Sequence, residues 1–236
     1  MRQIVLDTET TGTEAARGDR VIEIGCWELL DRRPTGRKFH CYLNPDRDSH
    51  PEALKVHGLT TDFLSDKPRI DEIVDDFLAF IRDGELVIHN AAFDVGFLNA
   101  ELERCGAHYG SVADHVVGVL DTYKLAREMY PGQRASLDAL CRRFGIDNTE
   151  RQLHGALLDA GLLLDVYLAL TSGQFDLGFG SEERAPVHAV ADVAAHVYDV
   201  RVVCASESER VAHRARMAVI EKQSGQRLWI EAVETP

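Results

Sequence analysis

Carboxylates stand in three short stretches of the chain, and one stretch also carries a histidine. Asp7 and Glu9 follow an apolar run, and Asp94 closes the stretch His-Asn-Ala-Ala-Phe-Asp. Asp159 stands five residues after His154. Carboxylates only accept hydrogen bonds and repel one another, so several gathered in one site need a cation. Hard oxygen ligands without paired thiolates favour Mg²⁺ or Mn²⁺ over zinc, and pairs of such ions serve phosphodiester hydrolysis.

Each stretch alone has an ordinary structural explanation. An Asp-x-Glu at a strand end is usually solvated or caps a helix. Asp94 could be a first-turn acid that faces a helix dipole, Asp159 a helix-surface acid and His154 a structural histidine. The joint occurrence of all three stretches is what favours a shared site.

Composition and charge limit the function classes. The chain has 236 residues, enough for one good core plus an appendage or for two small domains. Its hydrophobic content of 45% and charged content of 28% are ordinary for a globular protein. A net charge of −13 and a pI of about 5.2 disfavour a duplex binder with a broad basic face. An enzyme that grips a few nucleotides remains compatible, because bound divalent ions supply positive charge.

Cysteine usage and hydropathy predict a cytoplasmic protein. The five cysteines are odd in number and contain no CxxC pair, so neither a disulfide framework nor a zinc site is expected. The longest apolar stretch, residues 157–170, is interrupted by Asp159 and Asp165. We therefore expect no membrane segment.

The elements that would position the acids form an α/β pattern. Residues 4–6 are a β-prone run typical of a central strand, after which Asp7 and Glu9 project to one face and Thr8 to the other. Short connections predict an antiparallel meander with strands at residues 4–6, 21–29 and 39–43 and a turn at residues 32–36. The later elements are expected as helices at residues 70–81, 94–105, 136–144 and 155–170 and strands at residues 86–88 and 116–120. This order predicts a mixed β-sheet flanked by helices on both faces.

The order and spacing of the acidic stretches resemble the three motifs of the DEDDh 3′→5′ exonuclease superfamily. The resemblance covers residues 1 to about 170 and implies a ribonuclease H-like fold. It implies that Asp7, Glu9, Asp94 and Asp159 are metal carboxylates and that His154 is the general base.

The mechanism that follows from the resemblance uses two Mg²⁺ or Mn²⁺ ions. Asp7 would bridge them, Glu9 and Asp159 would complete the ion that carries the attacking water, and Asp94 would hold the other. His154 would take a proton from that water. Residues five apart on a helix lie about 140° apart, so His154 must precede the helix that carries Asp159. Gly155 is compatible with a helix that begins after His154.

A second set of residues is expected to line the path of the substrate. The set comprises Thr8, Thr10, Gly12, His57, Asn90 and Phe93. Small residues such as Thr10 and Gly12 let a substrate end approach the backbone, and aromatic rings such as Phe93 stack on frayed bases. The stretch at His57 looks like a family element near the terminal nucleotide, but a turn explains it equally well. Phe97 is expected in the core, Asp121 as a helix cap or an outer partner of the site, and His89 in a structural role.

Residues 172–186 are rich in Gly, Ser, Glu and Pro and are expected to form a flexible linker after the domain at residues 1–171. Gln174, Leu177 and Phe179 resemble the motif with which bacterial proteins dock on the sliding clamp. Apolar side chains displayed in an extended segment suit a peptide anchor. Alternatively, these side chains fold back onto the domain.

The last segment, residues 187–236, is too small for a core of its own. Residues 200–205 favour a strand, and Ser206 and Glu209 form a capping box that opens a helix ending at Gly225. Residues 200–229 are similar to the C-terminal segment of the epsilon-subunit family of bacterial DNA polymerase III, which implies binding to the polymerase alpha subunit. Trp229 would be an anchor of that interface.

Together these observations predict a proofreading 3′→5′ exodeoxyribonuclease that accepts a frayed, single-stranded 3′ end of DNA and releases nucleoside 5′-monophosphates. Unpairing energy would then discriminate mismatched ends. Two alternatives stay open. The first is a free-standing exoribonuclease of the ribonuclease T or oligoribonuclease type, which would share every catalytic residue. The second is a replisome scaffold with a silent active site.

Overall fold

The computed structural model describes residues 1–149, 151, 153–172 and 205–225. The chain divides into two units, Met1–Gly180 and Ser181–Pro236, which are taken separately below. Within the described residues, no helix has both the length and the apolar character that crossing a membrane requires.

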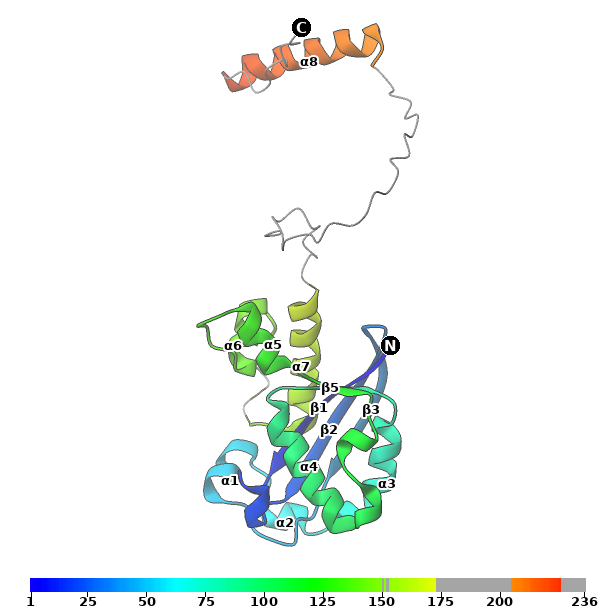
Figure 1. Cartoon of the computed structure of the whole chain (residues 1–236). Coiled ribbons are helices and arrows are strands. Elements are labelled where there is room, and N and C mark those ends of the chain that lie inside the picture. Colours follow the sequence, from blue (N-terminus) through cyan, green and yellow to red (C-terminus); the bar gives the residue numbers. More distant parts are fainter. Residues whose placement is uncertain (150, 152, 173–204, 226–236) are drawn as a thin grey trace, which may run out of the picture. The chain divides into compact units, whose positions relative to one another are not determined.

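A five-stranded mixed sheet forms the centre of the first unit (Figure 1). Its strands are β1 (Arg2–Thr10), β2 (Val21–Leu30), β3 (Arg33–Tyr42), β4 (Glu85–Ile88) and β5 (Gly118–Asp121), in the order β3-β2-β1-β4-β5. β1, β2 and β3 pair antiparallel, whereas β4 pairs parallel with both β1 and β5. The predicted meander and the predicted mixed sheet are thus confirmed.

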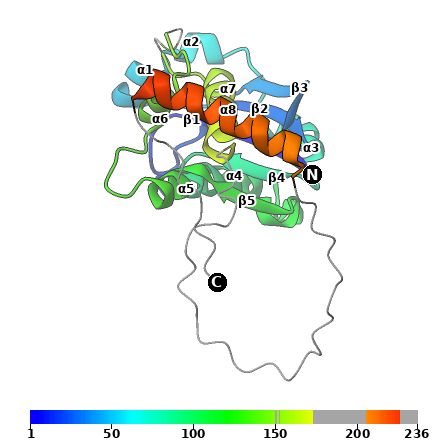
Figure 2. The same cartoon turned by 90° about the horizontal axis from the view of Figure 1, so that it is seen from above.

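Helices connect the strands after the meander. In the first unit they are α1 (Pro51–His57), α2 (Thr61–Leu64), α3 (Ile70–Ile81), α4 (Ala91–Cys105), α5 (Thr122–Met129), α6 (Leu137–Phe144) and α7 (Ala156–Thr171). Short 3₁₀ turns occupy Ala15–Arg17, Ala107–Tyr109 and Val112–Asp114. The helices α1 and α2 lie together in both views (Figures 1 and 2). The hydrophobic periodicity predicted α3, α6 and α7 to within one residue, but α1, α2 and α5 were not predicted.

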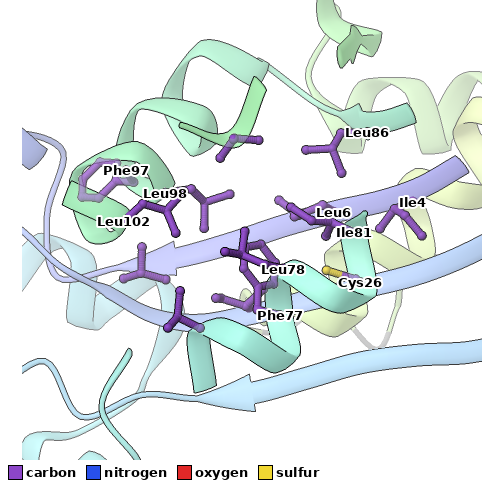
Figure 3. Packing of buried hydrophobic residues seen from close by; sticks show 14 of the residues in the cluster. Ile4, Leu6, Cys26, Phe77, Leu78, Ile81, Leu86, Phe97, Leu98 and Leu102 are labelled. Carbon is purple, nitrogen blue, oxygen red and sulfur yellow. The ribbon is translucent and has the colours of Figure 1, made fainter. Parts of the chain in front are cut away.

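Side-chain alternation along β1 divides the core between two faces of the sheet. Ile4 and Leu6 pack with residues of α3 and α4, such as Phe77 and Leu98 (Figure 3). Val5 belongs to the other cluster, which includes residues of α6 and α7. Helices therefore cover both faces, as expected for a ribonuclease H-like fold.

The predicted turn at residues 32–36 is wrong in its extent. The turn consists of Asp31 and Arg32, whose φ angles of 48° and 63° are left-handed, and β3 begins at Arg33. Two left-handed residues make the tight hairpin turn whose twist matches the flanking strands. Pro34 misled the prediction, but it lies in β3 at the edge of the sheet, where a missing N–H is tolerated.

In the second unit, α8 (Glu207–Ser224) agrees with the predicted helix. The Ser206 N–H donates to Glu209 Oε2 at 2.8 Å, the Glu209 N–H donates to Ser206 Oγ at 3.3 Å, and Gly225 ends the helix with a φ of 67°. No described residue of α8 is buried. Residues 200–204 of the predicted strand at residues 200–205, Trp229 and the clamp-motif residues Gln174, Leu177 and Phe179 lie outside the described residues.

Candidate active site

The four predicted carboxylates and His154 line one cavity of about 170 Å³. Its lining residues are Asp7, Thr8, Glu9, His89, Asn90, Phe93, Asp94, Leu137, Arg151, His154 and Asp159. The strand β1 brings Asp7 and Glu9 to the cavity, α4 brings Asp94, and the start of α7 brings Asp159. Residues far apart in the sequence therefore meet beside β1.

Asp94 is held by Thr8 of the neighbouring strand. The Thr8 backbone N–H donates to Asp94 Oδ1 at 3.1 Å, and Thr8 Oγ1 donates to the same oxygen at 2.7 Å. Asn90, with a left-handed φ of 67°, turns the chain from β4 into α4 three residues earlier than predicted. Asp94 therefore lies in the first turn of α4, where the helix dipole favours a negative charge.

His154 lies just before α7, as the spacing required. Gly155 is the N-cap residue and accepts a hydrogen bond from the Asp159 N–H at 2.8 Å. The His154 N–H donates to the Val56 carbonyl at 3.0 Å. The start of α7 rests directly on β2, because a Cβ added to Gly25 would lie 2.3 Å from the Leu157 nitrogen. This close approach sets the position of His154 and Asp159 relative to β1.

Burial and mutual repulsion raise the pKa of most of these carboxyl groups. The pKa of Asp7 lies well above its usual value because of burial and then because of Asp94, Glu9 and Asp159. Burial, followed by the charge of Asp159, raises the pKa of Glu9 to about 8. Burial also raises the pKa of Asp94 to about 6, against the opposing effect of its hydrogen bonds with Thr8. Such a cluster is stable in its ionised form only with a cation.

The donor set fits divalent metal ions. Ligand atoms of Glu9, His154 and Asp159 all lie within 4.8 Å of one another. Asp7 and Asp94 add buried carboxylates on the same cavity. Oxygen-rich sites of this kind suit hard divalent cations.

Arg151 is the charged cavity residue that the sequence analysis missed. Its guanidinium donates to Asp159 through Nε at 2.6 Å and Nη2 at 2.6 Å, and Nη1 donates to Asp138 Oδ1 at 2.6 Å. Burial pushes the pKa of Asp159 upward, but the neighbouring His154 and Arg151 outweigh burial and hold it below its usual value. Nothing in the sequence marks Arg151, because its acidic partners are 13 and 8 residues away.

A groove of about 690 Å³ adjoins the acidic cavity and shares Thr8, Glu9 and Phe93 with it. The predicted lining residues Thr8, Thr10, Gly12, His57 and Phe93 border this groove, and Asn90 borders the acidic cavity. Arg17 and Arg47 also border the groove.

Two groove residues, Gly12 and Thr10, have structural reasons of their own. At Gly12 the Asp19 side chain packs closely against the backbone, because a Cβ added there would lie 2.3 Å from Asp19 Oδ2. The glycine is therefore required by the protein's own packing and not only by a substrate. Thr10 Oγ1 donates to the Gly12 carbonyl at 2.6 Å. His57 is the last residue of α1, and its buried Nε2 has no hydrogen-bond partner among the described residues.

The predicted core position of Phe97 and the predicted helix cap at Asp121 are confirmed, and His89 lines the acidic cavity. Phe97 is 2% exposed and belongs to the core. Asp121 caps α5 by accepting from the Tyr123 N–H at 3.0 Å, and it also accepts from the Asn90 N–H at 3.2 Å. The Nδ1 of His89 lies 3.0 Å from Thr122 Oγ1.

Comparisons with known proteins agree with this geometry. The exonuclease family RNase T matches residues 4–167. The chain is 47% identical over 236 residues to the DNA polymerase III subunit epsilon of Salmonella typhimurium and 45% identical over 236 residues to that of Escherichia coli K12, with 97% of each chain covered in both cases. It is 52% identical over 174 residues to the DNA polymerase III subunit epsilon of Rickettsia typhi, which covers 74% of this chain and 76% of the relative.

Solved structures share the fold of the first unit. An E. coli exonuclease I–single-stranded DNA complex has a TM-score of 0.64 at 18% identity, covering 73% of this chain and 41% of that one. Exonuclease X in complex with 5′ overhanging duplex DNA has a TM-score of 0.52 at 26% identity, covering 73% of this chain and 94% of that one. The identities to curated relatives over nearly the whole chain place this protein in the DNA polymerase III epsilon family of exonucleases.

Proposed function

We propose that this exonuclease performs 3′→5′ proofreading for DNA polymerase III at the cavity formed by Asp7, Glu9, Asp94, Asp159 and His154. The observation that carries the proposal is the convergence of four carboxylates and one histidine on a single cavity beside β1. Such a cluster lacks a structural purpose, because burial destabilises the charged forms of its carboxylates. The pKa values of Asp7, Glu9 and Asp94 are raised for that reason.

Two divalent ions, Mg²⁺ or Mn²⁺, are the proposed cofactors. Asp7 would contribute to both, Glu9 and Asp159 to one, and Asp94 to the other. When bound, the ions would polarise the phosphodiester and lower the pKa of water. The protein's own contribution is to fix the ligands: Thr8 orients Asp94 by two hydrogen bonds, and β1 directs Asp7 and Glu9 to the same face.

His154 is the proposed general base. It stands ahead of α7 on a segment tied to the Val56 carbonyl, and its side chain is 42% exposed at the cavity. An unprotonated imidazole nitrogen can accept a proton from a nearby water. The His154 ring can therefore accept the proton of the attacking water, while the carboxylates bind the cations.

The groove beside the cavity is the proposed path of the 3′-terminal nucleotides. Phe93 borders both spaces and offers an aromatic face to a base. Arg17 and Arg47 border the groove and carry positive charge suited to phosphates. His57 also borders the groove. Frayed ends would enter this groove more readily than paired ends.

The proposed partners are the alpha subunit of DNA polymerase III and the sliding clamp. Support for the alpha subunit comes from α8, which leaves Val211 and Val219 about half exposed, at 53% and 48%. A helix with exposed apolar residues gains stability when a partner covers them. Support for the clamp is the sequence of residues 174–179 alone. The corresponding organisation is an exonuclease domain at residues 1–171, a linker at residues 172–186 and a polymerase-binding segment at residues 187–236.

Matched oligonucleotides test the substrate. We expect 5′-labelled single-stranded DNA to shorten from its 3′ end with Mg²⁺ or Mn²⁺, with release of nucleoside 5′-monophosphates, and RNA of the same sequence to react more slowly. A strong preference for RNA would favour an exoribonuclease, and inactivity with either ion would favour a silent scaffold. Co-purification of polymerase with the full chain, but not with a chain that ends near residue 180, would support the assignment of the tail.

A further inference from the structure

The buried guanidinium of Arg151 binds Asp159, a carboxylate that the proposed metal site requires. Arg151 is 8% exposed, and its Nε and Nη2 contact both oxygens of Asp159 at 2.6 Å. Two parallel, charge-assisted hydrogen bonds of this kind are the strongest contact that arginine makes with a carboxylate. Of the four cavity carboxylates, Asp159 is the one with a bidentate cationic partner among the described residues.

The same guanidinium also engages His154. Its Nη2 lies 3.0 Å from His154 Nδ1. The same Nδ1 lies 3.3 Å from Asp159 Oδ2. Arg151 therefore contacts both a proposed ligand, Asp159, and the proposed base, His154.

We propose that Arg151 is an internal counter-ion that occupies Asp159 in the metal-free protein and competes with the divalent ion for it. The inference rests on the proposed metal site and deepens it. In the metal-free state, Arg151 offsets part of the repulsion among the buried carboxylates. Loading the site requires the guanidinium to leave Asp159, because a divalent cation and a guanidinium on the same carboxylate repel each other.

Asp138 would continue to bind the Arg151 guanidinium after it leaves Asp159. Its Oδ1 accepts from Arg151 Nη1 at 2.6 Å, on the side opposite the contacts with Asp159. The Asp138 side chain is 49% exposed and stands in the first turn of α6, whereas Asp159 is 3% exposed. Arg151 can therefore release Asp159 and keep one charged partner near solvent.

Calorimetric titration of the full-length protein with Mn²⁺ tests the proposal, together with thermal melts in chelator and in saturating Mn²⁺. The variants are Arg151→Gln, which removes the charge, and Arg151→Lys, which keeps the charge but not the bidentate contact. Arg142→Gln is the matched control, because Arg142 is exposed on α6 and its one hydrogen bond among the described residues is to the Asp138 carbonyl, at 3.2 Å.

We expect Arg151→Gln to bind Mn²⁺ about tenfold more tightly than the natural protein, with Arg151→Lys between them and Arg142→Gln unchanged. In chelator, Arg151→Gln should melt about 2–4 °C lower, and saturating Mn²⁺ should close that gap, since the pair is then broken in both proteins. Weaker or unchanged binding by Arg151→Gln, a melting gap that persists with Mn²⁺, or Arg151→Lys equal to the natural protein would overturn the proposal. Absence of Mn²⁺ binding by the natural protein would instead overturn the proposed metal site.

Discussion

Thr8 donates two hydrogen bonds to one oxygen of Asp94, through its backbone N–H at 3.1 Å and through Oγ1 at 2.7 Å. The contact joins β1 to the first turn of α4 and leaves the second Asp94 oxygen without a bond from Thr8. Asp94 is 2% exposed, so its orientation is fixed by these bonds rather than by solvent. Thr8 thus acts as a positioning residue for a proposed metal ligand.

Replacement of Thr8 by Val should weaken metal binding without unfolding the protein. Valine keeps the shape of threonine but lacks the hydroxyl, so Asp94 would lose one of its two bonds from Thr8 and some of its fixed orientation. We expect Mn²⁺ affinity to fall about 10–100-fold, as is typical when a partner of a metal ligand is lost. Titration calorimetry measures the change. Thr8→Ser keeps the hydroxyl and should bind Mn²⁺ nearly as well as threonine; equal loss in both variants would exclude the orienting role.

The metal-free protein should become less stable as the pH rises from about 5 to 8. Burial raises the pKa of Glu9 from 4.5 to about 8 and that of Asp94 from 3.8 to about 6, so the native state holds these protons more tightly than the unfolded chain does. The stabilisation by protonation is complete below the unfolded pKa values and is lost as the pH passes through the native ones. Each unit of raised pKa corresponds to about 1.4 kcal/mol.

Thermal melts across this pH range measure the effect. With saturating Mn²⁺ the melting temperature should no longer fall between pH 5 and 8, because a bound cation favours the ionised carboxylates. A metal-free melting temperature that rises over the same range would show that Glu9 and Asp94 are already ionised at pH 5.

Substitution of Gly25 by Ala should disturb the site from a distance. An added Cβ would lie 2.3 Å from the backbone of Ala156 and Leu157, so the start of α7 would have to shift, and His154 and Asp159 with it. Overpacking of this kind costs about 1–3 kcal/mol, and exonuclease activity should fall as well. Gly96→Ala is the control: nothing lies within 4 Å of its added Cβ, and alanine in a helix stabilises by up to about 1 kcal/mol. Unchanged melting of Gly25→Ala would contradict the close packing of β2 and α7.

Replacement of His154 by Ala should abolish most turnover and leave the fold intact. The loss of a general base lowers rates by about 10²–10⁴-fold. Steady-state hydrolysis of a labelled DNA oligonucleotide gives the rate, and a thermal melt checks the fold. His108→Ala is a suitable comparison, because His108 is exposed and does not line the cavity. Wild-type rates in His154→Ala would reject the proposed role.

The regular elements of the fold were predictable because their signals are local. Alternation placed Asp7 and Glu9 opposite Thr8, and the capping serine and terminal glycine bounded α6. The hairpin turn was misplaced because Pro34 and Gly36 are common turn residues, whereas the left-handed conformations at Asp31 and Arg32 have no strong sequence signal.

The contacts between distant residues were not predictable in the same way. The motif resemblance identified the carboxylates of the site, but it did not indicate which residue would offset their negative charge. Arg151 meets Asp159 eight residues away in the sequence, and one arginine among many carries no mark of such burial. The double hydrogen bond from Thr8 to Asp94 likewise depends on the packing of α4 against β1.

Anomalous diffraction from crystals of this protein grown with Mn²⁺ tests most directly whether the four carboxylates hold catalytic ions. The account predicts Mn²⁺ peaks in the cavity in contact with Asp7, together with Glu9, Asp94 or Asp159, and loss of both the peaks and the DNA hydrolysis in Asp7→Ala. A cavity without Mn²⁺ in a protein that still degrades DNA from its 3′ end in a Mn²⁺-dependent reaction would contradict it.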